Sequence, residues 1–294
     1  MKLAHYGEDR LIAELTRSLS SDHSIRIGIG DDCAVIGKKG ATRWQLLKTD
    51  CLVENVHFLP ETAPRRIGWK ALARAISDIA AMGGLPRYAL ITLAVSPEVD
   101  VRRLKGIYSG LKKAADRFNI RIVGGETSSS PGPLFISIAL TGEVESNYCI
   151  TRSGGRVGDL LYVTGKLGGS IRGHHLDFLP RVEEARWLVE NFRLRAMMDL
   201  SDGLAADLPR IAAASKTGFE IFENQLPCNK ACSAHEALTD GEDYELLFAI
   251  APRQAASLES KWLKRFPKLA LTCVGRLTAH AQSSFPVYGF DHFA

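Results

Sequence analysis

The sequence predicts a two-domain protein of the α+β or α/β class. The chain has 294 residues, which is more than one hydrophobic core usually holds. Apolar segments with strand-like and helix-like spacing alternate along it, as in domains of mixed structure. A hydrophobic fraction of 46% with 24% charged residues is typical of a globular protein in water. We place the domains at residues 1–146 and 147–294.

In the first domain, apolar residues with helical spacing predict helices over residues 8–19, 64–82 and 99–118. Period-two or continuous apolar runs predict strands over residues 44–50, 88–95, 120–123 and 134–144. Pro64 and Gly83 stand where prolines and glycines begin and end helices. Asp78 lies inside this second helix, so its carboxylate must be exposed, hydrogen-bonded or bound to metal.

The second domain continues the alternation of strands and helices. A glycine-rich turn at residues 165–169 follows its first strand. The pattern predicts strands over residues 160–165, up to 199, 219–222, 244–250 and 271–274, and helices over 181–191 and 204–215.

Composition excludes several classes of protein. The first residues lack the apolar core of a signal peptide, and no apolar run approaches the roughly 18 residues of a membrane helix. We therefore expect a cytoplasmic protein with no membrane partner. The net charge is only +4, and the basic residues are dispersed in pairs, so no nucleic acid partner is expected.

The six cysteines are scattered without a Cys-x-x-Cys pair, and we expect them to be reduced. Cys228 and Cys232 resemble half of a zinc site, but no second pair stands at matching spacing.

Short acidic motifs beside small residues recur along the chain. Each aspartate alone could close a turn or cap a helix. Together they predict one divided metal site, because converging carboxylates repel each other unless a cation lies between them. Their hard oxygen ligands favour Mg²⁺ or Mn²⁺, and Mg²⁺ in turn points to a phosphate substrate. The motifs are Gly-Ile-Gly-Asp-Asp at 28–32, Lys-Thr-Asp at 48–50, Ser-Asp at 77–78, Gly-Gly-Glu-Thr at 124–127 and Asp-Leu-Ser-Asp-Gly at 199–203.

These motifs resemble those of the thiamine-monophosphate kinase family, within the aminoimidazole-ribotide synthase-like superfamily. The resemblance covers nearly the whole chain. Its most specific parts are His57-Phe58, Gly-Glu-Asp-Tyr-Glu-Leu at 241–246 and Gly-Phe-Asp-His-Phe at 289–293. The resemblance implies an aminoimidazole-ribotide synthase-like fold, with an N-terminal sheet that pairs in a homodimer and a C-terminal α/β domain. A nucleotide would lie in the cleft between the domains.

The resemblance further implies an ATP:thiamine-phosphate phosphotransferase. It would move the γ-phosphoryl group of ATP to thiamine monophosphate, giving thiamine diphosphate and ADP by in-line transfer. Several Mg²⁺ ions are implied, and a K⁺ requirement stays open. The chain has neither a P-loop nor a protein-kinase catalytic loop. An acceptor phosphate with a second pKa near ~6 needs no general base, so positioning and charge neutralisation would carry catalysis.

Residue roles follow from the matching motifs. The residues expected to hold metal are Asp32, Thr49, Asp50, Asp78, Glu126, Asp199 and Asp202. The expected ATP contacts are Gly125, Arg152 and Ser201, and the expected contacts to thiamine monophosphate are His57, Glu242 and Phe290. The catalytic set is Asp50, Asp78, Asp199 and Arg152. His57 also fits a structural histidine, and Phe290 also fits an aromatic that packs down the tail.

The sequence departs from the family pattern at three places. Glu126 replaces the usual aspartate, Lys48 stands where serine or threonine is usual, and residues 170–196 form a shorter segment. Lys48 either substitutes its own charge for one cation or marks an altered activity. Two alternatives therefore stay open. One is another ATP-dependent enzyme of the superfamily, and the other is a non-catalytic protein that binds nucleotide or thiamine phosphate.

Overall fold

The computed structural model describes residues 6–280, and its strands form two sheets within that range. The first sheet has the order β1-β2-β3-β6-β4-β5, and its neighbouring strands are antiparallel except for the parallel pair β4 and β5. Its strands are β1 (Ile25–Ile27), β2 (Ala34–Ile36), β3 (Arg43–Val53), β4 (Leu85–Val95), β5 (Arg121–Ser129) and β6 (Phe135–Glu145).

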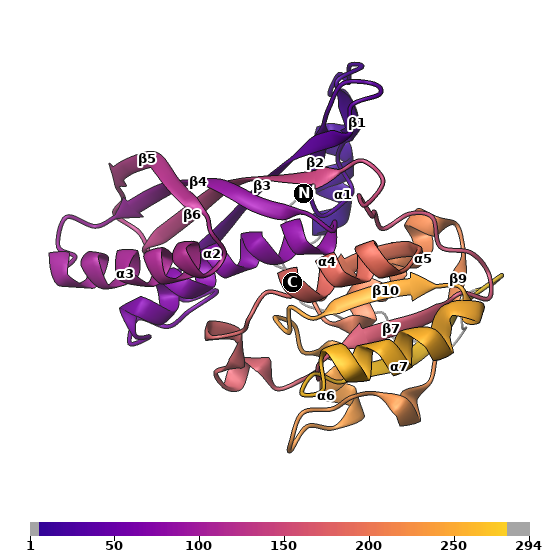
Figure 1. Cartoon of the computed structure of the whole chain (residues 1–294). Helices are drawn as coiled ribbons and strands as arrows, with labels where there is room; N and C mark the ends of the chain where they lie inside the picture. Colours follow the sequence, from indigo (N-terminus) through magenta and orange to yellow (C-terminus); the bar gives the residue numbers. More distant parts are fainter. Residues whose placement is uncertain (1–5, 281–294) are drawn as a thin grey trace.

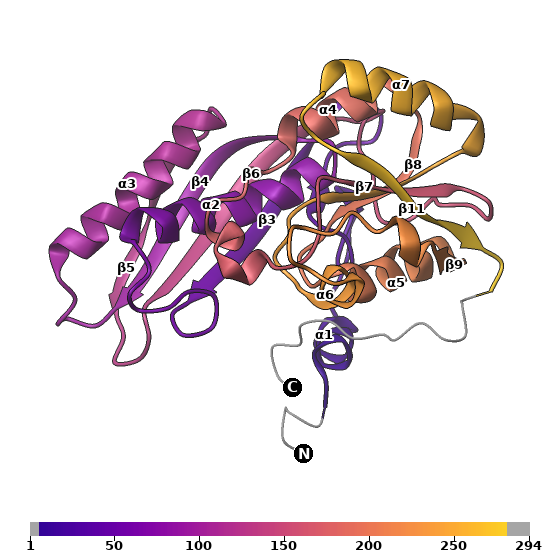
Figure 2. The ribbon, with the colours of Figure 1, turned by 90° about the horizontal axis from the view of Figure 1, so that it is seen from below.

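Helices cover one face of this sheet. Helices α2 (Pro64–Ala81) and α3 (Val101–Arg117) pack side by side against it (Figure 2). A Cβ atom on Gly68 of α2 would lie 1.9 Å from the carbonyl oxygen of Ile107 in α3, so glycine is what lets the two helices approach this closely. A further helix, α1 (Glu8–Thr16), precedes β1.

Among residues 6–280, no helix covers the other face of the first sheet (Figure 1). Several apolar side chains on this face are exposed to solvent. Tyr88 is 54% exposed, Leu90 47% and Val123 58%. We call this face, formed by β3, β6, β4 and β5, the open face.

The second sheet is antiparallel throughout, in the order β8-β10-β7-β11-β9. Its strands are β7 (Leu160–Thr164), β8 (Leu194–Asp199), β9 (Gly218–Ile221), β10 (Leu246–Ile250) and β11 (Leu271–Thr278). The α-helices of this domain are α4 (Val182–Asn191), α5 (Leu204–Ser215), α6 (Ala234–Thr239) and α7 (Ala255–Arg265). Its 3₁₀ helices are η2 (Ser170–Arg172), η3 (His174–Leu176), η4 (Glu223–Gln225) and η5 (Pro252–Gln254).

Helix α2 joins the two halves of the molecule. It contacts the first sheet on one side and α4 and β8 of the second domain on the other. The apolar residues of α2, α4 and α7 belong to one continuous core, while α5 packs with a separate core on the opposite face of the second sheet. The charged residues of α2 near this junction are therefore held in a fixed place relative to both domains.

The structure confirms the predicted two-domain architecture of mixed helices and strands. The first helix is shorter than predicted and ends at Thr16, before a polar turn. Gly124 and Gly125 were expected to follow a strand, but they lie inside β5. The division at residue 146 stays a prediction. Among residues 6–280, no helix combines the length and apolar character that crossing a membrane requires.

Candidate active site

Three buried carboxylates meet at the junction of the domains. Asp32 lies in the loop before β2, Asp78 lies near the end of α2, and Asp199 is the last residue of β8. One carboxylate oxygen from each lies within 4.8 Å of the other two. Elements far apart in the sequence thus bring three of the predicted metal ligands together, and we call them the acidic cluster.

Each member of the acidic cluster has a partner that offsets its charge or donates a hydrogen bond to it. Lys48 Nζ lies 2.6 Å from Asp78 Oδ1, and Arg152 Nη2 lies 2.5 Å from Asp32 Oδ1. Ser77 Oγ donates a hydrogen bond of 2.5 Å to Asp199 Oδ2. These partners reduce the repulsion among the three carboxylates even without a bound metal ion, although they do not remove it.

The pKa values of the three carboxylates in the acidic cluster are raised, and burial is the main cause for each of them. Burial is the main cause that raises the pKa of Asp199 to about 6, and the nearby Asp32 carboxylate adds to the rise. Burial also raises the pKa of Asp78, against the opposing effect of Lys48. Burial raises the pKa of Asp32 as well, although Arg152 opposes it. A cation bound among these groups would favour their charged forms.

The acidic cluster fits a divalent metal ion. Asp32 Oδ2 is buried and has no hydrogen-bond partner among the described residues. A buried carboxylate oxygen without a partner is costly, and coordination to an ion satisfies it. Because the donors are carboxylate oxygens, the site suits Mg²⁺ or Mn²⁺.

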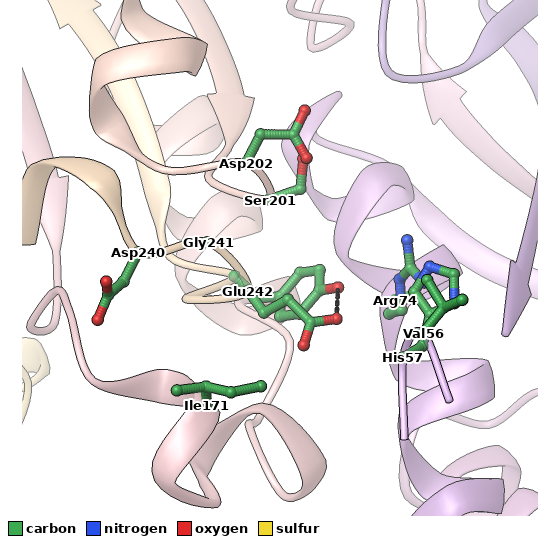
Figure 3. A pocket seen from close by; sticks show the side chains of 10 residues that line it. Val56, His57, Arg74, Ile171, Ser201, Asp202, Asp240, Gly241 and Glu242 are labelled. Carbon is green, nitrogen blue, oxygen red and sulfur yellow. Dashed lines mark hydrogen bonds between the residues drawn. The ribbon is translucent and has the colours of Figure 1, made fainter. Parts of the chain in front are cut away.

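A pocket of about 290 Å³ opens between the two domains. Val56, His57 and Arg74 line it from the N-terminal domain, and they face the residues that line it from the C-terminal domain (Figure 3). The C-terminal side consists of Ile171, Ser201, Asp202, Asp240, Gly241, Glu242 and Tyr244.

A fully buried lysine holds the two walls of this pocket together. Lys70 Nζ donates a hydrogen bond of 2.7 Å to the carbonyl oxygen of His57 and lies 2.6 Å from Glu242 Oε1. Burial lowers the pKa of Lys70 to about 8, while Glu242 opposes this shift. Glu242 and Tyr244 have φ angles of 64° and 52°, which non-glycine residues seldom adopt.

Other predicted site residues lie beside these groups. Asp50 Oδ2 lies 3.2 Å from Arg74 Nε, and Asp202 Oδ2 lies 2.6 Å from Arg210 Nη1. His57 is buried, and its Nδ1 accepts a hydrogen bond of 3.0 Å from the Val53 amide. Phe290 lies outside the described residues.

Thr49 and Glu126 are not brought to the acidic cluster within one chain. Thr49 alternates with Lys48 along β3 and is exposed on the open face. The strand register places Glu126 level with Cys51 of β3, with β6 and β4 between them. Three strand spacings separate these positions by about 14 Å. Their assignment as metal ligands stays a prediction.

Gly125 has a structural requirement for glycine. It adopts a φ of 156°, and a Cβ atom there would lie 1.8 Å from the carbonyl oxygen of Ile91 in β4. The backbone of β5 therefore carries no side chain at this position, which allows a ligand to approach it closely. Its expected contact with ATP stays a prediction.

Sequence reasoning missed Lys70 and Arg74, although a signal was present. Lys70, Arg74 and Asp78 follow one another at intervals of four residues in α2. They therefore lie on one face of an otherwise apolar helix. Because Asp78 was already assigned to the metal site, the charged residues four and eight positions before it on the same helix face were candidates for that site too. The short segment at 170–196 forms η2, η3 and α4, and its Ile171 lines the pocket.

Comparison with known proteins follows the same two-domain division. Residues 30–144 match the AIR synthase related protein N-terminal domain, and residues 156–285 match the corresponding C-terminal domain. The chain is 40% identical to the thiamine-monophosphate kinase of Rhodopirellula baltica, over 80% of this chain and 79% of that protein. It is 33% identical to the thiamine-monophosphate kinase of Escherichia coli K12, over 98% of both chains.

Two solved structures of similar fold also carry the thiamine monophosphate kinase or ThiL name. The structure of AaThiL complexed with AMPPCP and TMP has a TM-score of 0.85 and 31% identity, covering 99% of both chains. The structure of thiamine monophosphate kinase from Aquifex aeolicus has a TM-score of 0.78 and 30% identity, covering 95% of this chain and 96% of that one.

The pKa of Asp199 predicts how metal affinity depends on pH. Because this pKa is raised to about 6 in the metal-free protein, Asp199 holds a proton below that pH and must release it to bind Mg²⁺. We expect Mg²⁺ affinity to fall as the pH drops through about 6, and proton release on binding to rise there. Calorimetric titration with Mg²⁺ in buffers of different ionisation enthalpy measures both. An affinity that stays constant between about pH 5 and 7 would contradict the assignment.

Proposed function

The chain belongs to the thiamine-monophosphate kinase family, and we propose that it transfers the γ-phosphoryl group of ATP to thiamine monophosphate. The products are thiamine diphosphate and ADP. The acidic cluster carries this proposal, because its Asp32 Oδ2, buried at a domain junction with no partner in the described part of the chain, is suited to a metal ion that binds phosphates.

The transfer needs no general base on the protein. The acceptor phosphate is largely dianionic at pH 7, so one of its oxygens attacks the γ-phosphorus while the ADP oxygen leaves in line. No proton moves to a side chain in this step. His57, whose Nδ1 accepts a hydrogen bond from the Val53 amide, would thus act by hydrogen bonding rather than as a base.

Asp32, Asp78 and Asp199 would hold Mg²⁺, which when bound neutralises phosphate charge and positions the reacting groups. Arg152 adds a guanidinium at the edge of the acidic cluster, with 20% of its side chain exposed. We propose that it contacts a phosphate of ATP, together with Ser201, which lines the pocket. Several Mg²⁺ ions and a cytoplasmic location are parts of the same proposal.

The pocket between the domains suits the acceptor. His57 and Glu242 line it from opposite domains, and the Lys70 ammonium fixes the distance between them. The Glu242 carboxylate offers acceptors to amino groups of the ligand. Phe290, outside the described residues, is proposed as an aromatic contact with the thiamine rings.

We also propose that the open face pairs with the same face of a second copy. Its exposed Tyr88, Leu90 and Val123 would be buried in such a homodimer. A twofold axis passing between β6 and β4 would place β5 of one copy near β3 of the other. The partner's Glu126 would then approach Thr49, which explains how the two residues could share a metal although one chain keeps them apart.

The first test is turnover. We expect ATP-dependent formation of thiamine diphosphate from thiamine monophosphate, and none from a panel of other phosphorylated acceptors, assayed with and without K⁺. Asp78→Asn should lower kcat about 100-fold or more, because it removes charge from the site where phosphate charge is neutralised. Asp116→Asn, at an exposed ion pair on α3, is the control. Nucleotide binding without turnover in the wild type would favour a non-catalytic protein instead.

A second prediction concerns the acceptor. Glu242→Gln should raise the KM for thiamine monophosphate about 10-fold to 150-fold, since a hydrogen bond to a charged group contributes about 1.5–3 kcal/mol. The KM for ATP should change much less. Glu98→Gln, at an exposed position, controls for loss of charge. If only the KM for ATP rises, the pocket binds the nucleotide and not the acceptor.

A third prediction concerns the homodimer. Leu90→Asp places a charge in the middle of the open face and should shift the protein from dimer to monomer in analytical ultracentrifugation. Leu263→Asp, at a position in α7 that is 68% exposed, is the matched control and should stay dimeric. A wild type that sediments as a monomer at all concentrations would contradict the pairing.

A further inference from the structure

Lys48 reaches the acidic cluster from the face of the first sheet that α2 covers. It belongs to β3, where it is level with the buried Leu140 and therefore faces α2 rather than the open face. Its Nζ lies 2.6 Å from Asp78 Oδ1, and only 23% of its side chain is exposed. The lysine is thus directed into the site and not into solvent.

The charges around Lys48 are those of the proposed metal site. Asp78 shares the acidic cluster with Asp32 and Asp199. Arg152 pairs with Asp32, whereas Lys48 is the cation paired with Asp78 among the described residues. The two cations together offset two of the three negative charges. A metal ion bound to the same oxygen of Asp78 would lie in contact with the Lys48 ammonium, and the two positive charges would repel each other.

We propose that the Lys48 ammonium is a permanent cation of the active site, which takes the place of one divalent ion beside Asp78. The inference rests on the proposed kinase function, because that function sets what the acidic cluster binds. The second oxygen of Asp78 remains for an ion shared with Asp32 and Asp199. This protein would consequently bind one divalent ion fewer than the same site with a neutral residue at position 48.

Lys48 keeps this place only if a divalent ion does not displace it. The side chain has a flexible stem, so an incoming ion of higher charge would push it outward if the two compete for the same oxygen. Its burial under α2 opposes that movement. The two arrangements differ in where Lys48 lies once the site is loaded, and this difference can be observed directly.

The first experiment locates ions in the wild-type protein. Crystals of the full chain with AMPPCP and Mn²⁺ give Mn²⁺ positions by anomalous scattering. We expect Lys48 Nζ to stay on Asp78 Oδ1 while Mn²⁺ lies among the other carboxylate oxygens. Lys48 turned away from Asp78, with Mn²⁺ on that oxygen, would overturn the proposal. This test requires no variant that could fail to fold.

The second experiment counts ions in solution. Titration with Mn²⁺ in the presence of AMPPCP, followed by electron paramagnetic resonance, gives the number of ions bound per chain. Lys48→Thr should bind one more Mn²⁺ than the wild type, whereas Lys48→Arg, which keeps the charge, should bind the wild-type number. Lys112→Thr, which breaks an exposed ion pair on α3, is the control for loss of a lysine. Equal numbers in all four proteins would overturn the proposal.

Thermal unfolding provides a third measurement. In EDTA, Lys48→Met should unfold at a lower temperature than the wild type, because Asp78 is left buried without a cation. Mg²⁺ should raise the unfolding temperature of this variant more than that of the wild type. Equal Mg²⁺-induced shifts would count against the proposal. Turnover of thiamine monophosphate, measured on the same wild-type sample, separates failure of the kinase assignment from failure of the ion count.

Discussion

Burial of three carboxylates at the junction of two domains is the constraint on which the rest of the site depends. Asp32, Asp78 and Asp199 come from a loop, a helix and a strand, and their charges cannot be buried together without cations. Lys48 and Arg152 supply the cations that belong to the protein. Burial is the main cause that raises the pKa of each carboxylate, and a bound divalent ion would oppose this rise by favouring the charged forms.

Polar contacts at and near the acidic cluster also hold the two domains together. Lys70 of α2 binds Glu242 of the second domain, and Ser77 of α2 donates to Asp199 of β8. Arg152, just before the second sheet, returns to Asp32 of the first domain. The contacts that join the two domains are therefore also the contacts that assemble the site. A mutation that loosens α2 would disturb the acidic cluster and the acceptor pocket together, even without touching either.

Much of this could be predicted from the sequence, because the elements are strongly patterned and aspartates beside small residues mark strand and helix ends. The contact between Lys48 and Asp78 could not, since it depends on how α2 lies over β3. Helix α7 was missed although Leu258 and Trp262 repeat at four residues and are buried. Glu126 shows a different limit. Its motif resembles a metal ligand, but one chain places it at the far edge of the sheet.

The two cations of the acidic cluster differ in what a bound metal would do to them. Arg152 is partly exposed and binds Asp32, whose other oxygen is without a partner among the described residues. An ion bound to Asp32 would lessen the hold of that carboxylate on the guanidinium, which could then turn to a phosphate of ATP. Lys48 is exposed to a similar extent, 23% against 20% for Arg152, but it belongs to β3, and α2 packs over that strand and opposes outward movement of the side chain. Metal binding would thus convert Arg152 from a partner of Asp32 into a nucleotide contact, while Lys48 remains a fixed charge beneath the reacting groups.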